Sequence, residues 1–96
     1  MKMVMITYNE AVDPEVMDVV ENAKAGGYTK ILGTYGKGAA SGTHLGDDIW
    51  PGRNNIVFIA CEDEKAKKIF SEIKRLRKDL SSEGVKAFIM PIEDVT

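Results

Sequence analysis

The chain has 96 residues, of which 44% are hydrophobic and 29% charged, and its formal net charge is −2. A chain of this length predicts one domain over residues 1–96, small enough that oligomerisation would add useful burial. The slightly acidic balance favours neither a nucleic-acid nor a membrane partner, and no apolar run approaches the roughly 20 residues of a membrane span. The single cysteine, Cys61, excludes an internal disulfide and indicates a cytoplasmic protein.

The first third of the chain predicts a strand followed by a helix. Residues 2–8 alternate as a strand does, with β-branched and sulfur-containing side chains. Asp13-Pro14-Glu15 predicts the start of a helix, because aspartate can cap exposed amides and proline suits the first helical position. Gly26-Gly27 predicts its end. The apolar residues between them recur at helical spacing: Val16, Val19, Val20 and Ala23.

The remainder predicts three strands and a second helix. Strands are expected from about 28 to 35, from 55 to 62 and from 85 to 92. The middle one is apolar at nearly every position, so both of its faces should be covered. Asp63 is expected to cap the second helix and Gly84 to end it. The apolar stripe of this helix is the strongest in the chain: Ala66, Ile69, Phe70, Ile73, Leu76 and Leu80.

This order of elements, βαββαβ, predicts an α+β, ferredoxin-like fold. Right-handed crossovers would place both helices on one face of a four-stranded antiparallel sheet. The usual strand order puts the first and third strands at the centre, in agreement with their hydrophobicity. The other face of the sheet would be bare in a monomer. The side chains that favour covering it in an oligomer are Met3 or Met5, Ile56 or Val57, and Phe58.

The connection between the second and third strands, residues 36–54, is far longer than a hairpin needs. Long connections in small domains are uncommon and are usually functional or disordered. At its start, Gly33, Gly36 and Gly38 accompany Lys37. Glycines let several backbone amides approach an anion, and the lysine adds positive charge, so this segment suits phosphate binding. Plain flexibility of a glycine-rich loop is the alternative interpretation.

Other side chains give weaker signals for chemistry. His44, the only histidine, could contact a ligand, bind a metal with Asp47 or Asp48, or form ordinary surface hydrogen bonds. Cys61 ends an apolar strand and is better explained as a small core residue than as a nucleophile paired with His44. Trp50 is expected to pack at a subunit interface. Because these side chains supply no convincing pair of nucleophile and base, we expect no enzyme activity.

Four segments carry a resemblance to a known family: Gly27-Tyr28-Thr29, Gly33-Thr34-Tyr35-Gly36-Lys37-Gly38, His44-Leu45-Gly46 and Trp50-Pro51-Gly52. On these residues the chain resembles the P-II family of trimeric signalling proteins, specifically its short P-II-like members. It implies that residues 36–54 correspond to the T-loop of that family, which moves with ligand state and docks on target proteins. It also implies that adenine nucleotides bind in clefts between subunits, where Thr29 would contact the base, Gly33, Gly36 and Lys37 would frame the cleft, and Lys86 would contact phosphate.

These observations lead to one hypothesis and two alternatives. The first is a homotrimeric regulator that binds a nucleotide or another anionic metabolite between subunits and signals to a partner protein through residues 36–54. Its ligand-binding residues would be Thr29, Gly33, Gly36, Lys37, Gly38 and Lys86. One alternative is a divalent-metal-binding trimer that resembles the cation-tolerance family and uses His44. The other is a small enzyme or an assembly module without a ligand.

Overall fold

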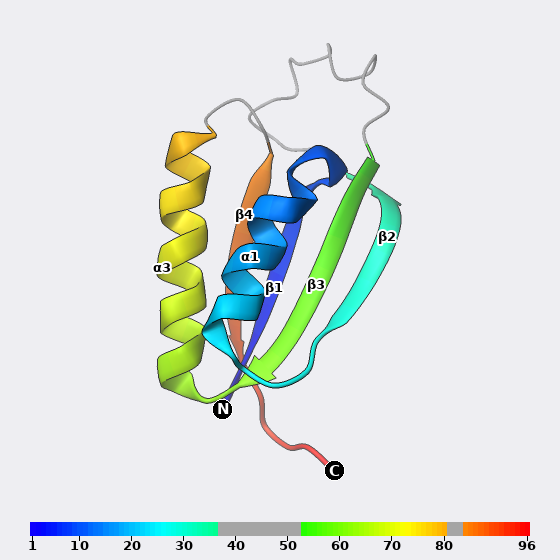
Figure 1. Cartoon of the computed structure of the whole chain (residues 1–96). Helices are drawn as coiled ribbons and strands as arrows, with labels where there is room; N and C mark the ends of the chain where they lie inside the picture. The colour runs from blue at the N-terminus through cyan, green and yellow to red at the C-terminus, as the bar shows by residue number, and fades with distance from the viewer. Residues whose placement is uncertain (37–52, 81–83) are drawn as a thin grey trace.

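A computed structural model describes residues 1–36, 53–80 and 84–96 of the chain. The helices and strands follow the predicted βαββαβ order (Figure 1), with one additional turn of 3-10 helix, η1. Their bounds are β1 (Lys2–Asn9), η1 (Glu10–Val12), α1 (Asp13–Ala23), β2 (Thr29–Tyr35), β3 (Arg53–Cys61), α3 (Asp63–Asp79) and β4 (Val85–Pro91).

The four strands form one antiparallel sheet in the order β2-β3-β1-β4. The central β1 pairs with β3 from Lys2↔Cys61 to Asn9↔Asn54 and with β4 on its other side. The prediction that the first and third strands are central is therefore confirmed. Both helices lie against the same face of the sheet (Figure 1). In the described ranges, neither helix is long and apolar enough to cross a membrane.

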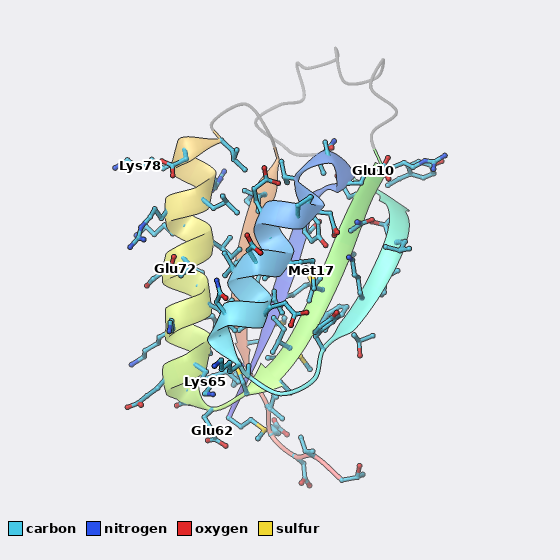
Figure 2. The ribbon with its side chains drawn as sticks, in the orientation of Figure 1. Glu10, Met17, Glu62, Lys65, Glu72 and Lys78 are labelled. Carbon is cyan, nitrogen blue, oxygen red and sulfur yellow. The ribbon has the colours of Figure 1, made fainter. Side chains whose placement is uncertain are left out.

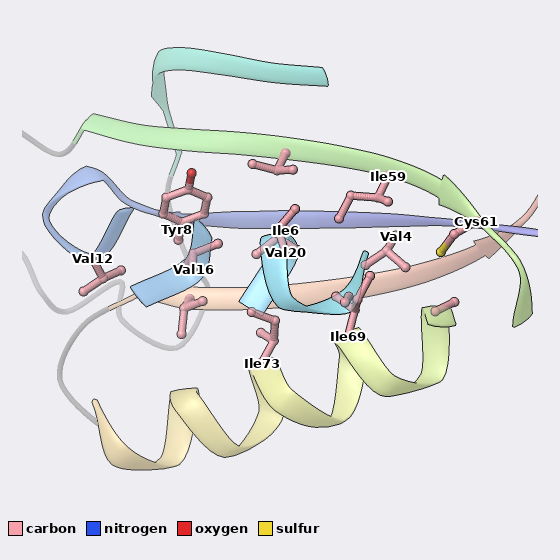
Figure 3. Close-up of a cluster of buried hydrophobic side chains, with 14 residues drawn as sticks. Val4, Ile6, Tyr8, Val12, Val16, Val20, Ile59, Cys61, Ile69 and Ile73 are labelled. Carbon is pink, nitrogen blue, oxygen red and sulfur yellow. The ribbon is translucent and has the colours of Figure 1, made fainter. Parts of the chain in front are cut away.

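The hydrophobic core fills the space between the helices and the sheet (Figure 3). Alternate residues of each central strand point into it, and the apolar stripes of α1 and α3 close it from the other side. Cys61 is buried among them, as expected for a core residue, and burial raises the pKa of its thiol. The largest of the fully buried side chains are Val4, Ile6, Tyr8, Val16, Val57, Ile59, Ile69 and Ile73.

The opposite face of the sheet, here called the outer face, is lined by the alternate residues of each strand. Val57 points into the core, so Ile56 and Phe58 are the residues through which β3 reaches the outer face. Cross-strand register places Met5 between Phe58 on β3 and Phe88 on β4. The outer face thus carries a continuous row of large apolar side chains, as expected for a surface that another subunit covers.

The prediction that Asp13 and Asp63 cap the two helices is wrong. Each is the first residue of its helix, and the cap positions are Val12 and Glu62, neither of which forms a side-chain cap hydrogen bond. The physical reason is competition from other donors. The carboxylate of Asp63 lies 3.0 Å from the N-terminal amine of Met1, which lowers its pKa, and the Asp13 carboxylate points into the sheet, as described below.

Both helices also end earlier than predicted. Helix α1 ends at Ala23, and its C-terminal cap is Lys24, with φ 50°, while Gly26, with φ 104°, lies two residues further on. Helix α3 ends at Asp79 rather than at Gly84. The glycines therefore lie within the connections. The charged side chains of α3, including Glu72 and Lys78, point away from the sheet (Figure 2).

Candidate functional site

The described residues of the predicted site lie on the two edge strands. Thr29 and Gly33 belong to β2, Gly36 directly follows it, and Lys86 belongs to β4. The other predicted residues lie outside the described ranges: Lys37, Gly38, His44 and Trp50. The structure therefore spreads the predicted β2 residues along one edge, with Thr29 at the start of the strand and Gly36 just past its end, and places Lys86 at the other edge.

A β-bulge shapes the end of β2 that leads toward residue 37. Pairing with β3 shifts between Ile31 and Thr34, where Leu32 and Gly33 stand opposite the single residue Asn55. Gly33 has φ +66°, a conformation that costs other residues about 1–2 kcal/mol. Its amide donates a hydrogen bond to the Asn55 side-chain oxygen at 3.3 Å. The Gly33 amide is thus already engaged within the chain.

Gly36 lies against β3. A Cβ atom on this residue would stand 3.2 Å from Nδ2 of Asn54, closer than ordinary packing allows. On the same pair of strands, the Thr34 hydroxyl donates to the Asn54 carbonyl at 2.8 Å. The absence of a side chain at Gly36 therefore lets its exposed backbone lie close to the sheet edge, as an anion-binding backbone requires.

A polar cluster beneath this bulge was not predicted from the sequence. Three donors converge on Oδ1 of Asp13: the Tyr8 hydroxyl at 2.6 Å, Lys30 Nζ at 2.7 Å and Asn55 Nδ2 at 3.3 Å. Tyr8 and Asn55 are 1% and 5% exposed, so their polar groups depend on partners within the protein. The cluster joins β1, α1, β2 and β3 at one point.

The electrostatics of the cluster favour an ionised Asp13. Burial opposes the charge, but hydrogen bonds from Lys30 and Tyr8, together with the positive charge of Lys30, outweigh it and lower the pKa of Asp13. Burial and the adjacent Asp13 carboxylate raise the pKa of Tyr8, so its hydroxyl remains a donor. The cluster is a fixed ion pair with neutral donors around it.

The positions of Thr29 and Lys86 constrain where a ligand could bind. Thr29 pairs with Phe58, and Lys86 pairs with Thr7, so both residues belong to the outer face. Two strands separate them, a distance of about 14 Å at the usual strand spacing. A ligand held by both residues of one chain would have to lie across the apolar row that includes Phe58. A ligand between the edges of two copies would avoid this.

Two other features bear on the alternatives. Among the residues that the structure describes, no group of three or more histidines, cysteines or carboxylates could hold a metal ion. A groove of about 250 Å³ lies between α1 and α3, on the side of the sheet away from the outer face. Its floor is formed by Ala23 and Ile69, and it contains none of the predicted site residues.

The sequence matches the model of one protein family, and the fold is similar to that of several solved structures. The family model described as nitrogen regulatory protein P-II matches residues 1–96. No curated protein matches the chain. Similar structures include CPII from Thiomonas intermedia K12 bound to ADP, AMP and acetate, with 18% identity over 95% of this chain and 84% of that one, and a TM-score of 0.73.

Two further structures show the same fold. A PII-like signaling protein from Thermus thermophilus has 20% identity over 92% of this chain and 82% of its own, with a TM-score of 0.65. CPII from Thiomonas intermedia K12 was also solved with ADP and bicarbonate; that structure has 19% identity, covers 95% of this chain and 84% of its own, and has a TM-score of 0.71.

Proposed function

The chain belongs to the P-II family of nitrogen regulatory proteins, and on that basis we propose that it senses an adenine nucleotide at clefts between the subunits of a homotrimer. Proteins of this family transduce signals and are not enzymes, so the chain is a PII-like signalling protein. The proposal concerns what it binds, how it assembles and how it passes the signal on.

Support for an adenine nucleotide comes from the structural neighbours and from the β2 edge. Several solved CPII structures contain ADP, with AMP, acetate or bicarbonate as further ligands, and another is the apo form. In this chain, the exposed backbone of Gly36 lies close to the sheet edge, and Lys37 and Gly38 follow in the sequence. We assign phosphate contacts to these residues and to Lys86, and a contact with the base to Thr29. Gly33 supports the edge rather than donating its amide to the ligand.

Support for a trimer comes from the outer face. Met5, Phe58 and Phe88 adjoin one another across three strands, and the exposed fraction of Phe88 is 41%. A partner subunit that covers this row would remove apolar surface from water. In such an assembly the edge strands of neighbouring copies form the clefts. Trp50 would add to this packing.

The observation that carries the proposal, beside the family, is the placement of Thr29 and Lys86 on opposite edges of one sheet face. This arrangement suits a ligand held between copies and not one held within a single chain. A ligand that contacts residues 36–54 would then change the conformation of this segment, because a ligand favours the conformation that it contacts better. The change would alter binding of the segment to a protein partner in the cytoplasm. The metal-binding alternative through His44 has no supporting observation among the described residues.

The experiment combines mass measurement with calorimetry. Light scattering at micromolar concentration should give the mass of a trimer, and ADP or AMP should bind, with and without bicarbonate or acetate. Lys86→Ala should weaken ADP binding about tenfold or more, since a charged hydrogen bond to phosphate contributes roughly 1.5–3 kcal/mol. Lys74→Ala, on the exposed side of α3, is the matched control. A monomeric protein, or one that binds divalent metal through His44 and no nucleotide, would refute the proposal.

A further inference from the structure

The polar cluster around Asp13 is connected to the candidate site through a single side chain. Asn55 donates from Nδ2 to the Asp13 carboxylate and accepts the Gly33 amide at Oδ1. An ionised carboxylate can only accept, so the Asn55 amide must turn its nitrogen toward Asp13. Its oxygen is then left facing the bulge. Asp13 thus fixes the orientation of Asn55, and Asn55 fixes Gly33.

The environment of Asp13 favours this orientation. Lys30 on β2 supplies a positive charge next to the carboxylate, and the Tyr8 hydroxyl on β1 supplies a neutral donor. Lys30 and Asp13 are mostly buried, with side-chain exposures of 24% and 30%. Hydrogen bonds to a charged, partly buried acceptor are stronger than those between neutral groups. The carboxylate therefore holds Asn55 more firmly than a water molecule would.

The bulge determines where the backbone after β2 lies. Gly33 occupies the left-handed region, and Thr34 resumes pairing with β3 directly after it. Without the extra residue of the bulge, the register from Thr34 onward would slip, and every following residue would exchange faces. Gly36, which depends on a close approach to Asn54, would then leave its position.

We propose that Asp13 and Asn55 are positioning residues for the ligand site, which hold the Leu32–Gly33 bulge so that the backbone at Gly36 is presented to an anion. They do not contact the ligand themselves. The proposal rests on the proposed nucleotide binding at this edge, and it adds that ligand affinity depends on a partly buried carboxylate of α1 that lies on the helix side of the sheet.

The test compares two variants that damage the same cluster differently. Asn55→Ala removes the link to Gly33, whereas Tyr8→Phe removes one donor from Asp13 and leaves the link in place. We expect Asn55→Ala to raise the dissociation constant for ADP roughly five- to tenfold, the equivalent of one lost hydrogen bond, and Tyr8→Phe to leave it within about twofold. Both variants should lower the melting temperature. If Asn55→Ala does not fold, Asp13→Asn, which keeps an acceptor but removes the charge, should give a smaller weakening in the same direction.

A second measurement separates this proposal from nucleotide binding itself. In the ligand-free protein, the amide resonances of Gly33 and Gly36 should move in Asn55→Ala and stay in place in Tyr8→Phe. This result would support the positioning role even if wild-type protein binds no ADP. The proposal is overturned if the Gly36 resonance is unchanged in Asn55→Ala, or if both variants weaken ADP binding equally, since general loosening of the fold would then explain the loss.

Discussion

Replacing Phe88 by aspartate should dissociate the proposed trimer. Phe88 lies on the outer face beside Met5 and keeps 41% of its surface exposed in the single chain. Its neighbours Ala87 and Ile89 point toward the core, so the substitution changes the outer face and leaves the core in place. The effect on assembly can therefore be separated from an effect on folding.

The magnitude follows from the exposed area. A phenylalanine side chain presents on the order of 200 Å², so 41% corresponds to about 80 Å² that a neighbouring subunit could bury. At about 25 cal/mol/Å², this amounts to roughly 2 kcal/mol per subunit, or about 6 kcal/mol per trimer. The dissociation constant of the trimer should then rise by about four powers of ten, and burial of a carboxylate would add to the loss.

Light scattering over a concentration series, with far-UV circular dichroism as a check on folding, measures this directly. Val95→Asp serves as the control, because Val95 is 60% exposed and lies in the tail after β4. We expect the control to keep the wild-type mass and Phe88→Asp to behave as a folded monomer at micromolar concentration. The reasoning fails if Phe88→Asp keeps the wild-type mass or if Val95→Asp dissociates to the same extent.

Other predictions concern the interior and the bulge. Asp13→Ala should lower the free energy of unfolding in urea by about 1–3 kcal/mol, because it leaves the buried Tyr8 hydroxyl without an acceptor; a loss below about 0.5 kcal/mol would contradict this account. The lowered pKa of Asp13 means that its stabilisation is present above the ordinary value near 3.9 and is lost as pH falls below it, so urea midpoints measured between about pH 5 and 2 should fall more for wild type than for Asp13→Asn. Gly33→Ala should cost about 1–2 kcal/mol in thermal unfolding because of its positive φ, while Gly27→Ala, without such a constraint, should cost less; equal losses would show that the bulge conformation is not required. The buried Cys61 thiol should react with a thiol reagent only as fast as the protein unfolds, and rapid labelling of the native protein would show that the strand end opens.

The fold could be predicted because its signals are local and mutually consistent. The period-two strands, the helical stripe from Ala66 to Leu80 and the order of elements all agree with one architecture. Helix boundaries were predicted less well. Asp13 and Asp63 occupy typical capping positions in the sequence, yet each carboxylate meets a stronger donor that comes from a distant part of the chain.

The polar cluster could not be predicted from local patterns, since Asp13 and Asn55 are 42 residues apart. One signal was available. The inward positions of β3 alternate as Asn55, Val57, Ile59 and Cys61, and an asparagine at an inward position of an apolar strand requires a buried partner. Its partner becomes evident only when α1 packs against the sheet and brings Asp13 beside β3. At Gly33 a positive φ favours the glycine that the sequence supplies, and at Gly36 the close approach of the Asn54 side chain does. The ligand-binding roles predicted for both residues stay predictions.

The central position of β1 has a consequence for synthesis of the protein. Its first partner, β3, begins at Arg53, and its second, β4, begins at Val85. At about 5–20 residues per second, the ribosome needs roughly 2–9 s to reach β3 after β1 is made. During that interval, the apolar strand around Val4 and Ile6 has no neighbour with which to pair. We therefore expect the nascent chain to depend on chaperones in this interval, and the sheet to close only after translation is nearly complete.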